Sequence, residues 1–291
     1  MRSRTGSFDF DGHRLVYDEY GAGNRLVVLM PGLLLSRLMH RQLAEALAER
    51  GHHVVCLDVL GHGESDRPEE MWNYSMTNFG AQALALLDHL GVEAAVVGGT
   101  SLGANASLEA AAAAPERVKG LLLEMPVLDN ALLGCALAFT PLLVGLTFGA
   151  PVARTLAAGA SRVPRGLSRL ADVGLDCLSQ DPKPSASVLQ GLFFGRVAPP
   201  RELRRRMQQP ALVIGHGRDP VHPFSDSDML VRELPNARLL EASSILELHL
   251  TPERLTEEIA RFAQGCFREK RPSGSRRRTP VAARRSAPRR S

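Results

Sequence analysis

A regular alternation of short apolar runs with longer segments of helical spacing constrains the fold of residues 26–126 more than any other feature. Apolar runs of about five residues are typical of buried strands, and segments of about 12 to 15 residues with apolar positions three or four apart are typical of helices. Strands that alternate with helices favour a mostly parallel sheet covered on both faces. We expect strands within 26–32, 53–59, 94–101 and 118–126, and helices over 37–50, 76–90 and 102–114.

The alternation is flanked by a hairpin and interrupted by one long helical stretch. Residues 8–20 alternate polar and apolar around Asp11-Gly12, a pattern that predicts a β-hairpin. Residues 127–207 are rich in Ala, Leu and Gly and are cut by prolines, and strand patterns resume only afterwards, at 211–220 and 237–243. We therefore predict a two-part α/β core (8–126 and 208–266) with a helical cap inserted over 127–207 and a last helix over 252–263.

One part of the cap is long and apolar enough to raise the question of a membrane span. No charged residue lies between Asp129 and Arg154, and the run could cross a bilayer by its length. Prolines and glycines interrupt it, however, and no Trp or Tyr flanks it. We expect buried or half-buried cap helices and no membrane span.

The net charge of +4 is unevenly distributed. Residues 268–291 contain ten Lys or Arg and one acidic residue, which gives this tail a charge of +9, whereas the remaining 267 residues hold 25 basic and 30 acidic side chains. A segment with so little to bury is expected to be disordered, and we predict a basic disordered tail over 267–291. Its charge fits contact with anionic lipid or nucleic acid.

Cysteine usage and the N-terminus indicate a reducing compartment. The four cysteines lie far apart and form no metal-binding spacing, and a core of this size needs no disulfides. The first fifteen residues contain no apolar stretch of the kind found in secretory signals. We expect a cytoplasmic protein with no bound metal.

The residues that carry chemistry are Gly99-Thr100-Ser101-Leu102-Gly103, between a predicted strand and a predicted helix. A Gly-x-Ser-x-Gly sequence in this context is typical of a nucleophile elbow, a tight turn that exposes a serine hydroxyl. The glycines leave room for the turn, and the helix that starts at Leu102 directs backbone N–H groups towards the serine, where negative charge develops.

Together with the nucleophile elbow, the surrounding sequence over residues 8 to about 264 resembles the α/β-hydrolase superfamily, in particular its cap-bearing esterase, lipase and perhydrolase-like branch. Four segments carry the resemblance: LVVLMPG (26–32), LDVLGHGESDRP (57–68), GGTSLG (98–103) and ALVIGHGRDPVHP (211–223). The resemblance implies an α/β-hydrolase fold and a catalytic triad that works without a cofactor.

The resemblance also implies roles for individual residues. Ser101 matches the nucleophile, and Asp219 matches the acid that orients the catalytic histidine. The backbone N–H groups of Leu33 and Leu102 match the two donors of the oxyanion hole. Family members usually have His-Gly where this chain has Pro31-Gly32, so a histidine that commonly supports this loop is missing.

The catalytic histidine is the residue that departs from the family pattern. It is expected after the last strand, about seven residues before the helix-opening Pro252, and that position is Ile245. His249 is the histidine nearest to it, and we take it as the predicted base. Two alternatives stay open: His222, three residues after the acid, or a displaced base that leaves the site impaired.

These features predict a carboxylic ester hydrolase that acts on a small or medium apolar ester through an acyl-enzyme. The apolar cap stretch 128–148 favours a lipophilic acyl or alcohol group. Two alternatives use the same fold: a protein that binds an apolar ligand without turnover, and an enzyme for acyl transfer or cofactor-free peroxide chemistry.

Overall fold

The computed structural model describes residues 3–268, with the exception of 167, 218, 220 and 245–246. The prediction of a disordered basic tail therefore concerns residues that lie almost wholly outside the described part of the chain.

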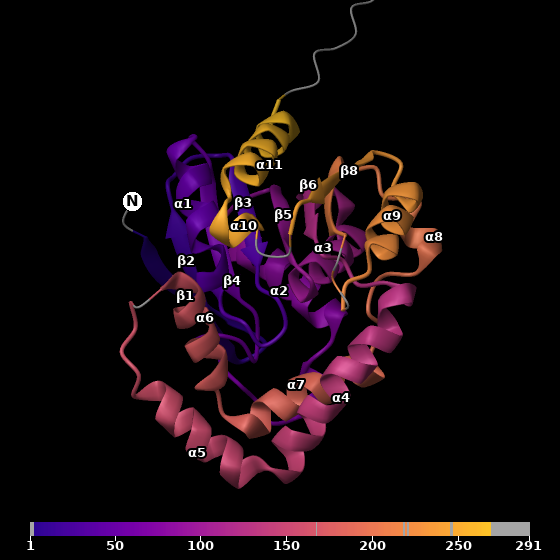
Figure 1. Ribbon diagram of the computed structural model, residues 1–291. Helices are drawn as coiled ribbons and strands as arrows, with labels where there is room; N and C mark the ends of the chain where they lie inside the picture. The colour runs from indigo at the N-terminus through magenta and orange to yellow at the C-terminus, as the bar shows by residue number, and fades with distance from the viewer. Residues whose placement is uncertain (1–2, 167, 218, 220, 245–246, 269–291) are drawn as a thin grey trace, which may run out of the picture.

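An eight-stranded sheet forms the centre of the molecule (Figure 1), in the order β1-β2-β4-β3-β5-β6-β7-β8. β1 and β2 form the antiparallel hairpin predicted around Asp11-Gly12, β2 is also antiparallel to β4, and all later neighbours are parallel. The mostly parallel sheet predicted from the alternation is confirmed. The strands are β1 Arg4–Phe10, β2 His13–Tyr20, β3 Leu26–Met30, β4 His53–Asp58, β5 Ala95–Thr100, β6 Val118–Glu124, β7 Ala211–His216 and β8 Ala237–Ala242.

Helices cover both faces of this sheet, as expected when parallel strands are buried on both sides. One apolar core lies between the sheet and α2, α3 and α9, and a second lies between the opposite face and α1 and α11. Figure 1 shows α1 beside α11, and these two helices contact each other. Their bounds are α1 Arg41–Glu49, α2 Met76–His89, α3 Leu102–Ala113, α9 Phe224–Glu233 and α11 Glu253–Cys266.

Two helices were not predicted. α9 connects β7 to β8, and its sequence is mostly polar. The short helix α10, Glu247–Leu250, follows β8, where we expected a loop that carries His249.

The helical segment between β6 and β7 forms a separate layer at the lower edge of Figure 1. α7 packs against α4 and against the short helix η2, and α6 contacts the short helix η1. The bounds are η1 Arg37–His40, η2 Met71–Asn73, α4 Leu132–Phe148, α5 Ala150–Ser161, α6 Arg169–Leu178, α7 Pro182–Phe194 and α8 Arg201–Arg204.

Polar side chains of the core hold the ends of this helical layer. The Asn105 side chain on α3 donates to the carbonyls of Val127 and Val197 and accepts from the Val127 amide, so that it joins the start and the end of the layer. The buried carboxylate of Asp226 on α9 accepts three more backbone amides just after β6, from Leu128, Asn130 and Ala131. Both attachment points are therefore fixed to the core.

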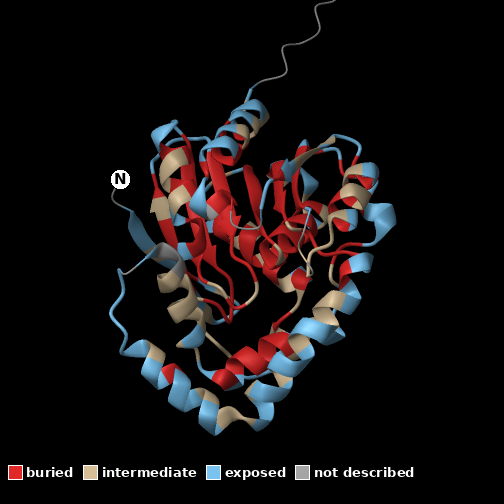
Figure 2. Cartoon of the chain, in the orientation of Figure 1, coloured by how far each residue is buried: buried red, intermediate tan, exposed pale blue. Residues whose placement is uncertain are grey.

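The degree of burial differs sharply within the layer. Figure 2 shows α7 largely buried, whereas α4 and α5 are mostly exposed. None of the α4 residues, all of which the structure describes, is buried. Our expectation of buried or half-buried cap helices is therefore wrong for much of this pair. In the described part of the chain, one helical segment, Asp129–Phe148, is apolar and long enough to cross a membrane, with a mean hydropathy of 2.0.

Candidate active site

Ser101 lies at a sharp turn between β5 and α3. Its φ of 54° and ψ of −107° are a strained combination for a residue with a side chain, as a nucleophile elbow requires. The backbone N–H of Ser101 donates to the carbonyl of Glu124 at 2.8 Å, which attaches the turn to the end of β6.

The two glycines of the elbow are required by one neighbouring atom. A Cβ at Gly99 or at Gly103 would lie 2.1 Å from the carbonyl oxygen of Met30, the last residue of β3. No such contact is tolerated, because the opposing atom belongs to the backbone. The Gly-x-Ser-x-Gly pattern therefore reflects the close approach of the elbow to β3.

Ser101 begins a chain of two hydrogen bonds that ends at a carboxylate. Its Oγ lies 2.8 Å from Nε2 of His222, and Nδ1 of the same ring lies 2.8 Å from Oδ2 of Asp219. With the ring proton on Nδ1, His222 donates to Asp219 and accepts the hydroxyl proton of Ser101. This is the order of groups in a serine–histidine–acid triad.

The loop after β7 supplies both the histidine and the acid. Oδ1 of Asp219 accepts the backbone N–H groups of Val221 and His222 at 2.8 and 3.0 Å, a local turn of the type that Asp favours. The turn brings the ring of His222 back to the other oxygen of the carboxylate. Burial opposes ionisation of Asp219, but these hydrogen bonds outweigh it and lower its pKa to about 2.

The structure brings two of the three predicted triad residues together, Ser101 and Asp219. The position that faces the Ser101 hydroxyl is occupied by His222, which the sequence offered only as an alternative. The backbone of His249 lies in α10, and its side chain is outside the described part of the structure. The role of His249 as the base stays a prediction. The usable signal for His222 was its three-residue spacing from Asp219.

The predicted oxyanion donors lie beside the serine. Leu33 and Leu102 both line the same pocket as Ser101. Leu102 is the first residue of α3, and N–H groups in the first turn of a helix have no partner within the helix. The turn that contains Leu33 is closed by a hydrogen bond from the Leu35 amide to the Gly32 carbonyl at 3.1 Å.

A pocket of about 370 Å³ adjoins Ser101, and its lining is mostly apolar. α4 and α7 contribute about half of the wall, and the rest comes from the core and from the segments that join it to the helical layer. Its volume falls in the range of sites for small molecules. Residues that line it from the two helices are Leu132, Cys135, Ala136, Phe139, Leu189, Leu192 and Phe193.

A second carboxylate–histidine pair lies behind the elbow. Glu124, at the end of β6, accepts from the Thr100 hydroxyl at 2.5 Å and lies 3.5 Å from Nε2 of His216, at the end of β7. The opposite ring nitrogen of His216 lies 3.0 Å from the Ser244 carbonyl. Burial opposes both charges, but the pairing prevails: the pKa of Glu124 is lowered and that of His216 is raised.

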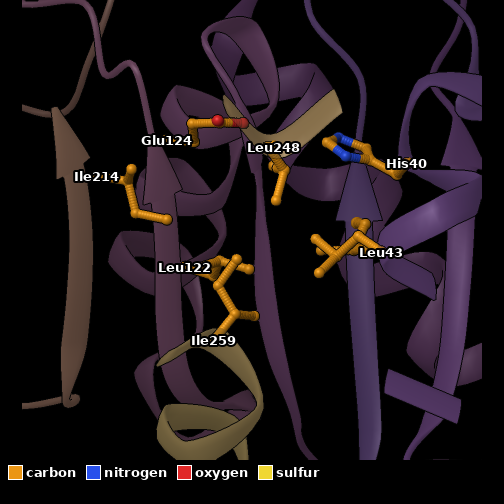
Figure 3. A pocket seen from close by; sticks show the side chains of 9 residues that line it. His40, Leu43, Leu122, Glu124, Ile214, Leu248 and Ile259 are labelled. Atoms are coloured by element: carbon orange, nitrogen blue, oxygen red, sulfur yellow. The ribbon is translucent and has the colours of Figure 1, made fainter. Parts of the chain in front are cut away.

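His216 lines an open pocket of about 740 Å³ that Ser101 does not line, and Glu124 lines a cavity of only about 10 Å³. Figure 3 shows Glu124 and His40 on either side of Leu248 along one edge of it. Nε2 of His40 lies 2.9 Å from the Met30 carbonyl, the same oxygen that faces the elbow glycines. A space of about one water molecule cannot hold a substrate, so this cluster supports the elbow from behind.

Metal ligands and disulfides are not found in the described part of the chain. No group of three or more His, Cys, Asp or Glu side chains could hold a metal ion there. The four cysteines are free.

Comparisons with known proteins agree with the fold. The sequence profile of the alpha/beta hydrolase fold matches residues 25–244. The 3-oxoadipate enol-lactonase 2 of Acinetobacter baylyi is 28% identical over 240 residues, which cover 79% of this chain and 86% of the relative. A putative carbamate hydrolase, RutD, of Azorhizobium caulinodans is 37% identical over 107 residues, which cover 37% of this chain and 39% of the relative.

Several curated relatives match over only about two fifths of their own length. Among solved structures, the enol-lactonase of Burkholderia xenovorans LB400 aligns with a TM-score of 0.73 at 21% identity, over 89% of this chain and all of that chain. This likeness concerns the fold.

Proposed function

Because the chain belongs to the α/β-hydrolase family, we propose that it is a serine hydrolase that cleaves small or medium apolar carboxylic esters through an acyl-enzyme. One observation carries this proposal: Ser101, His222 and Asp219 form a continuous hydrogen-bond chain beside an apolar pocket. We assign the base to His222, in place of the His249 expected from the sequence.

In the first half of the reaction, Ser101 Oγ attacks the carbonyl carbon of the ester while its proton moves to Nε2 of His222. Asp219 holds the ring through Nδ1 and stabilises the positive charge that forms on it. The oxygen of the tetrahedral intermediate accepts from the N–H groups of Leu33 and Leu102. The bond to the alcohol oxygen then breaks, and His222 returns the proton to the leaving alcohol.

In the second half, water attacks the acyl carbon and gives a proton to His222. The bond between the acyl carbon and Ser101 Oγ breaks, the carboxylic acid leaves, and the proton returns to the serine. Each group thus ends as it began.

The substrate class follows from the pocket. Its walls carry few polar groups, so it favours an apolar acyl or alcohol portion over a sugar or a charged peptide. Two of the similar proteins are named as enol-lactonases, and lactones are cyclic esters. These names agree with ester chemistry.

A fluorophosphonate probe tests the proposal without knowledge of the natural ester, since it reacts only with an activated serine. We expect wild-type protein to be labelled at Ser101, as located by peptide mass spectrometry, and we expect Ser101→Ala to lose both labelling and hydrolysis of p-nitrophenyl butyrate. A folded Ser101→Ala protein with undiminished hydrolysis would overturn the assignment of the nucleophile.

A further inference from the structure

The outer surface of α4 and α5 is unusually apolar for a protein in contact with water. Leu133, Leu137 and Phe148 of α4 are 72, 70 and 83% exposed, and Val152 and Leu156 of α5 are exposed to a similar degree. We call these five residues the outer apolar surface. Exposed apolar side chains are common singly, but a contiguous group on neighbouring helices marks an interaction site.

α4 differs from an ordinary surface helix because it has no polar face. Four of its residues line the pocket beside Ser101, and the residues on its outer side are also apolar. A helix that is apolar all round belongs in a protein core or in a lipid environment. None of its residues is buried in this chain, so burial within the chain does not account for its apolar sequence.

The charged residues on α5 and in the turn that follows it are all basic. From residue 130 to residue 171 there are four arginines and no acidic residue. Arg154 on α5 is half exposed and lies 3.9 Å from Asp181, and Arg162 and Arg165 are exposed just after α5. Apolar side chains next to exposed cations are complementary to an anionic lipid surface, where acyl chains lie below negative headgroups.

We propose that α4 and α5 dock on an anionic lipid membrane through the outer apolar surface, with the arginines after α5 among the headgroups. The pocket beside Ser101 shares its wall with α4, so docking places the pocket next to the lipid phase. On this basis the substrate class is an ester dissolved in the membrane; this last step rests on the proposed function, whereas the docking itself does not.

Cosedimentation with vesicles tests the docking independently of catalysis. We expect the full chain to bind vesicles of equal parts phosphatidylcholine and phosphatidylglycerol, to bind pure phosphatidylcholine more weakly, and to be partly released by salt. Leu133→Ser/Leu137→Ser should weaken binding by at least about tenfold, since two apolar side chains no longer enter the lipid. The control Leu203→Ser, a 39% exposed leucine on α8, should bind as wild type does.

Ser101→Ala should bind vesicles as wild type does, and this separates docking from the catalytic proposal. Hydrolysis of a water-soluble ester by the double variant should match that of wild type, which establishes that the variant is folded. Equal vesicle binding by wild type and the double variant would overturn the proposal. So would self-association in sedimentation velocity that the double variant abolishes, without vesicle binding, because the surface would then join two copies of the chain.

Discussion

Two carboxylate–histidine pairs lie at the ends of neighbouring strands, and they differ in what surrounds them. The Asp219–His222 pair is 8 and 16% exposed, faces the Ser101 hydroxyl and lies at an apolar pocket. The Glu124–His216 pair is 6 and 1% exposed. Glu124 adjoins a cavity of about 10 Å³, and Ser101 does not line the pocket of about 740 Å³ that His216 lines. Under the proposed function, the same two functional groups serve chemistry in one place and architecture in the other, and access to the Ser101 hydroxyl distinguishes the two places.

The more deeply buried pair, Glu124–His216, is called the inner pair, and its contacts show a structural use. Glu124 accepts from Thr100 with its side chain and from Ser101 with its backbone carbonyl, so it fixes the two residues at the centre of the elbow. A buried ion pair contributes little net stability compared with apolar residues, but the loss of one partner is costly because the other stays buried. We therefore expect the inner pair to influence the free energy of unfolding, and the outer pair, Asp219–His222, to influence turnover.

The largest effect that distinguishes the two pairs is expected in the turnover number of Asp219→Asn. An amide cannot stabilise the histidine cation and holds the ring in the wrong tautomer, so kcat should fall by roughly 10³ to 10⁴. Steady-state hydrolysis of p-nitrophenyl butyrate measures this, with Asp228→Asn on the surface as the control. If kcat changed less than about tenfold, turnover would not depend on the Asp219 carboxylate and the distinction between the pairs would fail.

Glu124→Gln should show the opposite pattern. The free energy of unfolding should fall by about 2 kcal/mol, because the substitution weakens the charge-assisted contacts of residue 124 to His216 and Thr100. The loss is limited to this size because His216 can give up its proton and stay buried as a neutral ring. Urea titration measures this, and Glu116→Gln, an exposed residue, serves as the control. A loss of kcat comparable to that of Asp219→Asn, with unchanged stability, would assign Glu124 to catalysis.

A smaller effect is expected in the pH dependence of stability. The lowered pKa of Glu124 stabilises the folded protein above the unfolded pKa of 4.5, and this stability is lost as the pH falls below that value. The raised pKa of His216 stabilises the folded protein below the unfolded pKa of 6.5, and this stability is lost as the pH rises through the pKa of the folded protein. The pair should therefore stabilise most between about pH 4.5 and 6.5. Asp219 keeps its contribution across this range, because its unfolded pKa of 3.8 lies below the range and its folded pKa is lower still, about 2.

Melting temperatures of wild type and Glu124→Gln at several pH values measure this effect. We expect their difference to be larger near pH 5.5 than near pH 9, since His216 has lost its charge at alkaline pH. A difference that grows with pH would show that the two residues are not an ion pair in the folded protein.

The sheet and the elbow could be predicted from the sequence because their signals are local. Apolar runs define the strands, and the glycines at 99 and 103 mark the close approach to Met30. The position of His222 could not be predicted in this way, since it depends on how the Asp219 carboxylate folds the loop after β7. The exposure of α4 was also missed, because an apolar sequence predicts burial without indicating what covers it.

The assignment of His222 as the base is the central claim, and one matched pair of variants tests it most directly. His222→Ala and His249→Ala each remove one imidazole, and kcat for p-nitrophenyl butyrate is measured for both beside wild type. We expect His222→Ala to lower kcat by roughly 10³-fold or more, as other losses of a triad histidine do, and His249→Ala to change it less than about threefold. The reverse result, a large loss in His249→Ala with His222→Ala nearly unchanged, would contradict the account and return the base to the residue that the sequence first indicated.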